Sequence, residues 1–218
     1  MTILALEFSS PQRSVAVLRT GGPAIAAEVV ETGGHGTNAF KMIEQVLAET
    51  KIEREQIEVM AVGLGPGSYT GIRAAISLAQ GWQLARDVKL LGVSSAECLV
   101  AQARAEKILG RVSVVIDAQR NEFYLATYEI SADGWNTIRP LRIAMVGEIP
   151  SCTGAGEILA GPEVTRWFPG GRTIFPRAAT LARLAVVRDG LVAGDKLEPI
   201  YLREANFAKV PARKSTVP

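Results

Sequence analysis

Apolar residues fall into short runs separated by glycine, proline and polar turns, a pattern typical of alternating strands and helices. Residues 3–8, 14–18 and 24–31 are predicted to be three strands, the first two joined by a Ser-Ser-Pro-Gln-Arg turn. A helix is expected from Thr37 or Asn38, either of which can cap it, to about Lys51. Its apolar positions at helical spacing are Phe40, Ile43, Val46 and Leu47.

In the rest of the first half, the pattern predicts a strand, a helix, a second strand and a second helix. A strand at 58–62 precedes a glycine-rich loop at 65–71, which leads into a proline-free, alanine- and leucine-rich segment at 72–86 that favours a helix. A short strand at 90–93 and a helix from Ser94 or Ser95 to about 107 complete a β-β-β-α-β-α unit.

The second half repeats this pattern at an offset of 110 residues. Residues 3–18 align with 113–128: each has an apolar strand, an acid near its end (Glu7, Asp117), a polar turn and a second strand. A third strand is expected at 136–145, a short helix at 157–160 and a helix at 178–188. We therefore predict an α/β protein of two related lobes with a cleft between them, residues 1–107 and 108–218, the second lobe reduced.

Composition excludes several classes of protein. The 218 residues are 48% apolar and 21% charged, which is a globular balance, and no apolar run approaches the length of a membrane span. With no basic leader after Met1, we expect a cytoplasmic protein that contacts no membrane. Cys98 and Cys152 are far apart and are expected to be reduced thiols. The single histidine, His35, excludes a histidine-rich zinc site, and no metal ligands are predicted.

Positive charge is concentrated near the C-terminus. Residues 166–214 contain 10 basic and 4 acidic groups within a chain of net charge +2. Such a segment either meets phosphates or places single arginines on solvated helix faces, and both interpretations stay open.

Several residues could form a degenerate nucleotide or phosphate site. Glycines at the start of a helix let backbone N–H groups approach an anion, although this loop is neither a Walker loop nor a dinucleotide fingerprint and could be a structural junction. Glu7 and Asp117 could hold magnesium or satisfy turn amides. The full candidate set is Glu7, Gly65, Gly67, Ser68, Asp117, Gly154 and Gly156.

The helix after the glycine loop has a face of small residues, Gly71, Ala74, Ala75, Leu78 and Gly81, that lets another helix approach closely. The neighbour could lie in the same chain or in a partner. Left uncovered, such a face would favour self-association into a homodimer.

Motifs spread over nearly the whole chain resemble the bacterial TsaB (YeaZ) family. They are Gly-Pro-Gly-Ser-Tyr-Thr-Gly-Ile-Arg at 65–73, Ile-Leu-Ala-Leu-Glu-Phe-Ser-Ser at 3–10, Gly-Val-Ser-Ser at 92–95, Ile-Asp-Ala at 116–118 with Glu-Phe-Tyr at 122–124, and Glu-Pro-Ile-Tyr-Leu-Arg at 198–203. The first of these is quite specific.

This resemblance implies a two-lobed actin, sugar-kinase and Hsp70 (ASKHA) fold and a role in making threonylcarbamoyladenosine in tRNAs that read codons beginning with A. It implies a non-catalytic scaffold that pairs with the transferase TsaD through helices of the first lobe, the pair recruiting the ATPase TsaE and contacting tRNA as a complex. The His-x-x-x-His metal motif of TsaD is absent, since His35 is followed four residues later by Ala39. No intrinsic cofactor is expected, and ATP, ADP or a divalent metal only in the assembled complex.

The partner interface is expected on residues 38–50 and 70–86. Its residues are Phe40, Ile43, Val46, Leu47, Tyr69, Gly71, Ile72, Ala74, Ala75, Leu78, Gly81 and Trp82.

The sequence also departs from the family. Glu7 stands where the family usually has Asp, which lengthens the side chain and changes the geometry of any inherited magnesium site. The alternative function is an enzyme of the same fold class, an ATP-dependent kinase or a metallopeptidase, and one histidine gives the peptidase little support.

Overall fold

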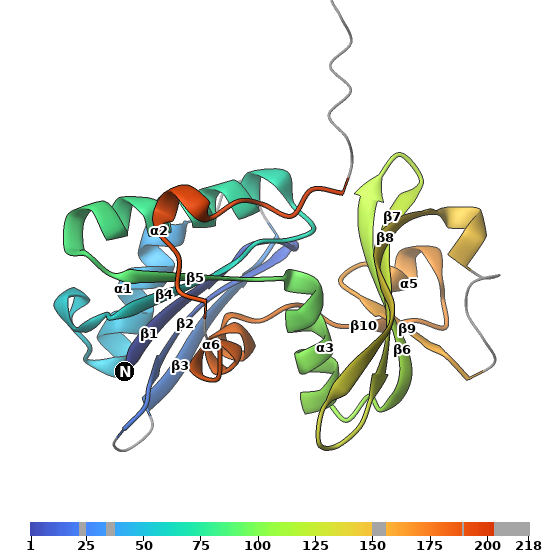
Figure 1. Ribbon diagram of the computed structural model, residues 1–218, viewed down its shortest axis with the longest axis horizontal. Helices are drawn as coiled ribbons and strands as arrows, with labels where there is room; N and C mark the ends of the chain where they lie inside the picture. Colours follow the sequence, from blue (N-terminus) through green and yellow to red (C-terminus); the bar gives the residue numbers. More distant parts are fainter. Residues whose placement is uncertain (22–24, 34–37, 150–155, 189, 203–218) are drawn as a thin grey trace, which may run out of the picture.

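The chain forms two lobes, each built on a five-stranded sheet, in a computed structural model that describes residues 1–21, 25–33, 38–149, 156–188 and 190–202 (Figure 1). The predictions for His35, Cys152 and Gly154 and for residues 203–218 lie outside the described residues. None of the described helices is both long and apolar enough to span a bilayer.

The first sheet has the order β3-β2-β1-β4-β5. β1 is the central strand; it pairs antiparallel with β2 and parallel with β4, and all six of its residues are buried. The bounds are β1 Thr2–Glu7, β2 Gln12–Arg19, β3 Ile25–Thr32, β4 Val59–Gly63 and β5 Lys89–Val93. The almost uninterrupted apolar sequence of β1 follows from this position, because both faces of a central strand are covered.

Two helices, α1 (Ala39–Thr50) and α2 (Tyr69–Arg86), cover one face of the first sheet. Met42, Ile43 and Val46 on α1 and Ile72 and Ala75 on α2 pack into one core with the strands. The opposite face packs on α6 (Ala178–Val186), whose Leu181 and Ala182 are fully buried against β1 and β4 residues.

The second sheet repeats the topology of the first. Its order, β8-β7-β6-β9-β10, places three antiparallel strands beside two parallel ones, as in the first sheet. The bounds are β6 Gly110–Gln119, β7 Glu122–Ile130, β8 Trp135–Met145, β9 Ile158–Gly161 and β10 Arg172–Thr173. Helix α3 (Ser95–Ala105) packs on the face toward the first lobe, and the four-residue α5 (Val164–Trp167) on the other. The predicted duplication with a reduced second lobe is confirmed.

Two sequence predictions are wrong in this region. Residues 157–160, expected as a helix, lead into and form strand β9, because Ile158, Leu159 and Ala160 pair in parallel with Val112–Val114. Residues 178–202, assigned to the second lobe, return to the first: α6 packs on β1 and β2, Val192 bridges Leu90, and the Ile200 N–H donates to the Leu64 carbonyl. In Figure 1 this orange and red segment lies against the first sheet and α2.

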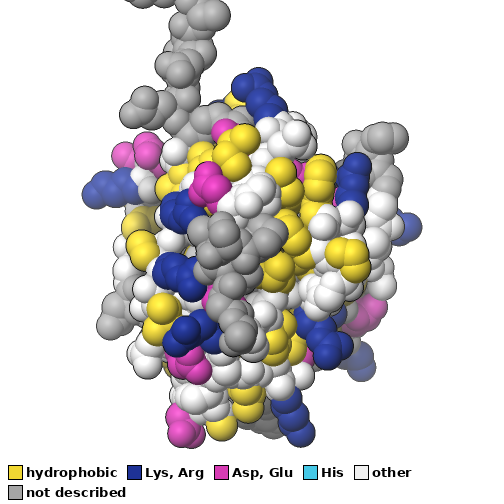
Figure 2. Space-filling view, turned by 90° about the vertical axis from the view of Figure 1, so that its right-hand side faces the viewer, with side chains coloured by type: hydrophobic (Ala, Val, Ile, Leu, Met, Phe, Trp, Pro, Cys, Tyr) yellow, Lys and Arg dark blue, Asp and Glu magenta, His cyan; other side chains and the backbone are white. Residues whose placement is uncertain are grey.

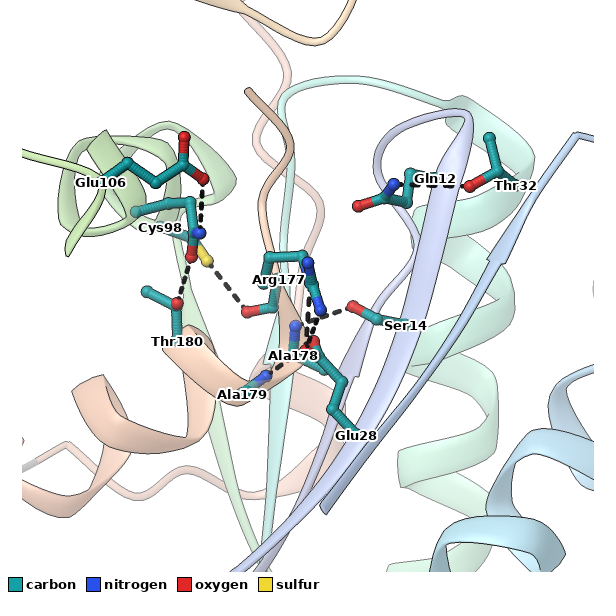
Figure 3. Close-up of polar contacts among 11 residues, drawn as sticks. Gln12, Ser14, Glu28, Thr32, Cys98, Glu106, Arg177, Ala178, Ala179 and Thr180 are labelled. Atoms are coloured by element: carbon teal, nitrogen blue, oxygen red, sulfur yellow. Dashed lines mark hydrogen bonds and ion pairs between the residues drawn. The ribbon is translucent and has the colours of Figure 1, made fainter. Parts of the chain in front are cut away.

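The start of α6 is fixed to the first sheet by polar contacts (Figure 3). The Glu28 carboxylate on β3 accepts hydrogen bonds from the Arg177 guanidinium, at 3.0 Å for Nε, and from the Ala179 N–H at 3.1 Å. The Ser14 hydroxyl on β2 accepts the Ala178 N–H at 2.8 Å. Two otherwise unsatisfied N–H groups of the first helical turn therefore find partners, and a carboxylate lies where the helix dipole favours negative charge.

The same residues connect the two lobes. The Cys98 thiol of α3 donates to the Arg177 carbonyl, and the Thr180 hydroxyl of α6 donates to Gln102 of α3. Because α3 packs on the second sheet, contacts run continuously from the first sheet through α6 and α3 to the second. The two lobes are thus connected through α6 and α3.

We predict that Glu28→Gln lowers the free energy of unfolding by about 1.5–3 kcal/mol, because a charged partner is removed from both Arg177 and the start of α6. Glu129→Gln is the matched control, since Glu129 forms an exposed pair with Arg111 at 3.5 Å and its loss should cost at most about 1 kcal/mol. Urea denaturation measures both. Equal losses in the two variants would contradict an anchoring role for Glu28.

Candidate functional site

A cleft of about 950 Å³ lies between the lobes. The first lobe contributes residues from the β1–β2 turn, β2 and the start of α2, and the second lobe contributes residues from β6, β7 and the β9–α5 turn. Tyr201, from the C-terminal segment, closes one side. The lining of the cleft includes Ser9, Ser10, Arg13, Gly67, Ser68, Tyr69, Thr70, Arg73, Asp117, Gln119, Glu163 and Tyr201.

Glu7 ends β1 and does not line the cleft. Its carboxylate is fully buried, accepts the Ser9 N–H at 2.8 Å and the Ser95 hydroxyl at 3.0 Å, and packs so closely on Gly63 that a Cβ there would overlap it. Burial raises the pKa of Glu7 above its usual value, although the hydrogen bonds from Ser9 and Ser95 oppose this shift. The structure therefore places Glu7 as a strand-end acid that holds two turns together.

The glycine loop is held against the end of β1. A Cβ at Gly67 would overlap the Ser9 carbonyl oxygen, and one at Gly71 would overlap that of Phe8. The Ser68 N–H donates to the Ser9 carbonyl at 2.7 Å, and the Gly65 N–H donates to the Ser95 hydroxyl at 3.1 Å. These glycines thus permit close backbone packing. Gly67 and Ser68 still border the cleft, whereas Gly65 does not.

Of the two described second-lobe residues of the predicted nucleotide site, Asp117 and Gly156, one lines the cleft. Asp117 lines the cleft, and one of its carboxylate oxygens accepts the Gln119 N–H at 2.6 Å. Gly156 precedes β9 with a φ of 83° and is not a cleft residue. Among the described residues, no group of three or more His, Cys, Asp and Glu side chains is placed to hold a metal ion.

An aromatic and cationic cluster at the cleft mouth was not predicted. The Arg73 guanidinium lies 3.9 Å from the centre of the Tyr69 ring, and its Nε donates to the Tyr201 hydroxyl at 3.0 Å. The two tyrosine rings are 5.9 Å apart. Residues 65–73 and 198–203 were both recognised as motifs, but nothing in the sequence indicated that the second crosses over the first.

The predicted partner interface needs correction. Ile43, Val46, Leu47, Ile72 and Ala75 are buried in the core of the first lobe, so these side chains face the chain's own strands and not a partner. Gly71 is likewise covered by Phe8. The helical spacing of these apolar residues predicts a partner-facing stripe, but in the structure this stripe faces the core of the lobe.

The rest of the predicted interface is exposed or half-buried, and of the half-buried residues Leu78 and Trp82 pack against the core of the first lobe. The Phe40 side chain is 70% exposed, and Gly81 lies on the outer face of α2 with open space around it. Ala74, Leu78 and Trp82 are half-buried. Leu84, which was not predicted, is 90% exposed on the same helix. Tyr69 is exposed as well, but it borders the cleft.

The basic C-terminal quarter does not form one patch in the described part of the chain. Arg177 pairs with Glu28 and Arg188 with Glu97. On the face shown in Figure 2, Lys and Arg side chains are spread between acidic and apolar ones. Within the described part of this segment, Arg177 and Arg188 therefore act as separate, paired charges, whereas Arg203, Lys209, Arg213 and Lys214 lie outside the described residues.

Comparison with known proteins identifies a family and individual relatives whose names refer to threonylcarbamoyl groups in tRNA. Residues 24–207 match the model of the family described as TsaD, tRNA N6-adenosine threonylcarbamoyltransferase. Proteins named tRNA threonylcarbamoyladenosine biosynthesis protein TsaB are similar over 98% of the chain: that of Haemophilus influenzae is 26% identical over 99% of its length, and that of Escherichia coli 27% identical over its full length.

Solved structures agree with these relatives. YeaZ from Pseudomonas aeruginosa is 27% identical, with a TM-score of 0.78 over 92% of this chain and 99% of its own. A second structure, described as an uncharacterized protein with similarity to peptidase YEAZ from Pseudomonas aeruginosa, gives 27% identity and a TM-score of 0.79 over 93% of this chain and 99% of its own.

Glu7 should give the stability of the protein a pH dependence that Glu7→Gln lacks. The pKa of Glu7 is raised in the folded state, so the wild type loses stability as the pH rises from below 4.5 through that raised value. We expect the stability of Glu7→Gln relative to wild type to increase over this window. Urea denaturation at several pH values measures the difference, and a pH-independent difference would contradict the account.

Proposed function

Because the chain belongs to the TsaB (YeaZ) family of threonylcarbamoyladenosine biosynthesis, within the wider TsaD family whose model it matches, we propose that it is the scaffold subunit of the threonylcarbamoyl transferase complex. Family membership places the protein in tRNA modification. The proposal adds that it binds TsaD, that this pair recruits TsaE, and that catalysis takes place in TsaD.

The outer face of α2 is the single observation that carries the proposal. Ser77, Gly81 and Ala85 are exposed at four-residue spacing, with half-buried Ala74 and Leu78 beside them and the 90% exposed Leu84 at the end. Small residues at this spacing let the backbone of a second helix approach closely, and exposed leucine adds apolar area that a partner would bury. Phe40 on α1 offers a second apolar contact on the same lobe.

The state of Glu7 supports a non-catalytic role. In a two-lobed enzyme of this fold class, the acid at the end of the first strand would serve the nucleotide-bound metal in the cleft. Here this acid is buried and accepts hydrogen bonds from Ser9 and Ser95, and the lobes are connected through α6 and α3. We therefore assign ATP-dependent chemistry and any divalent metal to the assembled complex rather than to a kinase or peptidase activity of this chain.

When TsaD is absent, the same face is free to pair with a second copy. The proposal thus includes a homodimer that competes with the heterodimer, because the two would use the same residues of α2. Addition of TsaD should replace the homodimer.

Gly81→Arg tests the proposed face without disturbing the fold. A Cβ at Gly81 meets no heavy atom within 4 Å, and arginine favours a helix interior over glycine by about 0.8 kcal/mol, so the variant should be as stable as the wild type. An unpaired charge buried against TsaD would cost about 3–5 kcal/mol. We expect association, measured by sedimentation velocity over a concentration series, to weaken at least about a hundredfold.

Gly147→Arg is the matched control, since Gly147 is exposed on the second lobe and a Cβ there also meets nothing within 4 Å. This variant should bind TsaD as the wild type does. Unchanged association of Gly81→Arg would overturn the assignment of this face, and equal weakening of both variants would show that the effect is not specific to α2.

A further inference from the structure

We propose that the mouth of the interlobe cleft binds a single strand of RNA, with a base stacked on Tyr69 or Tyr201 and phosphates held by Arg13 and Arg73. This site lies at the start of α2, where Arg73 is one turn before Ser77, the first exposed residue of the outer face assigned to TsaD. The inference rests on the tRNA pathway of the family and concerns the isolated chain, so its failure leaves the proposed TsaD interface untouched.

The tyrosine and arginine cluster is arranged to receive a base. Tyr69 is 55% and Tyr201 45% exposed, their rings are tilted by 31°, and Arg73 lies over the Tyr69 ring. Both rings are thus partly exposed to solvent, and the Arg73–Tyr201 hydrogen bond connects α2 to the C-terminal segment beside them. Proteins that bind single-stranded nucleic acids use such preformed aromatic platforms and arginine planes.

Charge differs between the two walls of the cleft. The first-lobe wall carries Arg13 on β2 and Arg73 on α2, and in the described part of the chain neither arginine forms a salt bridge. The second-lobe wall carries the carboxylates of Asp117 and Glu163. A ligand that fits this asymmetry has phosphates on one side and hydroxyl or amino donors on the other, and a ribonucleotide has both.

Hydroxyl groups complete the polar lining. Ser68 and Thr70 border the cleft on the first-lobe side and are at least partly exposed, whereas Ser9 and Ser10 are buried and the Ser10 hydroxyl already donates to the Gln12 carbonyl at 2.6 Å. The hydroxyls of Ser68 and Thr70 can donate to phosphate oxygens or accept from the ribose 2′-hydroxyl, the group by which proteins distinguish RNA from DNA. A volume of about 950 Å³, open to solvent at the tyrosines, accommodates unstacked nucleotides of a loop but not a rigid duplex.

The test uses the purified full chain and a fluorescein-labelled single-stranded oligoadenylate of about ten nucleotides, followed by fluorescence anisotropy over a salt series. With two arginine–phosphate contacts, the slope of log K against log salt should be about −1.4. Arg13→Ala should reduce the magnitude of this slope by about 0.7, since one contact is lost. Arg183→Ala, an exposed arginine on α6 away from the cleft, is the matched control and should leave the slope unchanged.

Stacking is tested separately from charge. Tyr201→Ala should weaken binding about tenfold, whereas Tyr201→Phe, which loses the hydrogen bond to Arg73 but keeps the ring, should stay within about threefold of wild type. Each variant is also tested for association with TsaD, which should be preserved. Unaltered association shows that a loss of RNA binding does not come from misfolding or from the partner interface.

Three outcomes would overturn the proposal. They are an absence of RNA binding, RNA binding that is insensitive to both Arg13→Ala and Tyr201→Ala, and binding of AMP as tight as that of the oligonucleotide, which would indicate a mononucleotide pocket. A DNA oligonucleotide of the same sequence should bind more weakly than RNA, because it lacks the 2′-hydroxyl.

Discussion

The contact between the Glu28 carboxylate and the start of α6 is the interaction on which the rest of the architecture depends. It brings a helix from the last fifth of the chain onto the sheet built by the first half, and Ser14 provides the second N–H acceptor. With α6 in place, residues 190–202 follow the first lobe, so that Tyr201 reaches Tyr69 and Arg73. The cleft and its mouth therefore depend on an ion pair at the opposite side of the sheet.

A second constraint acts at the end of β1. Glu7, Ser9 and Ser95 form a buried network that connects β1, the glycine loop and α3, and the glycines at 67 and 71 permit the backbone contact that completes it. Buried polar groups are costly unless each finds a partner, so this network is rigid when complete. The loop that resembles a phosphate cradle thus serves mainly to hold α2 at a fixed position against the first strand.

The sequence predicted most of the elements but not the order of the strands in each sheet. Strands β1 to β8 and helices α1, α2, α3 and α6 lie within a few residues of the bounds predicted from apolar runs and turn residues, whereas β10 was not predicted. Residues 157–160 were predicted as a helix because their local preference is weak, and pairing with β6 decided the outcome. The return of α6 to the first lobe depends on Glu28 and Arg177, which are 149 positions apart, and no local pattern encodes such a contact.

For the candidate sites, too, local sequence patterns predicted only part of what the structure shows. Periodicity located the apolar stripe of α1 but not the direction in which it faces, so core residues such as Val46 were read as interface residues. On α2 the small residues occur on both faces, with Ala75 buried and Gly81 open, and only the packed structure distinguishes them. The Tyr69–Arg73–Tyr201 cluster required knowledge of where the C-terminal segment lies.

Different parts of α2 thus have different roles. The first turn borders the cleft, the inner face packs on the sheet, and the outer face from Ala74 to Ala85 is free for another helix. The central claim is that this chain acts by holding TsaD. Size-exclusion chromatography with light scattering, on this protein and TsaD from the same source, tests it most directly. A mixed peak with the summed mass of one copy of each subunit is the predicted result, whereas two separate peaks from well-folded subunits would contradict the claim.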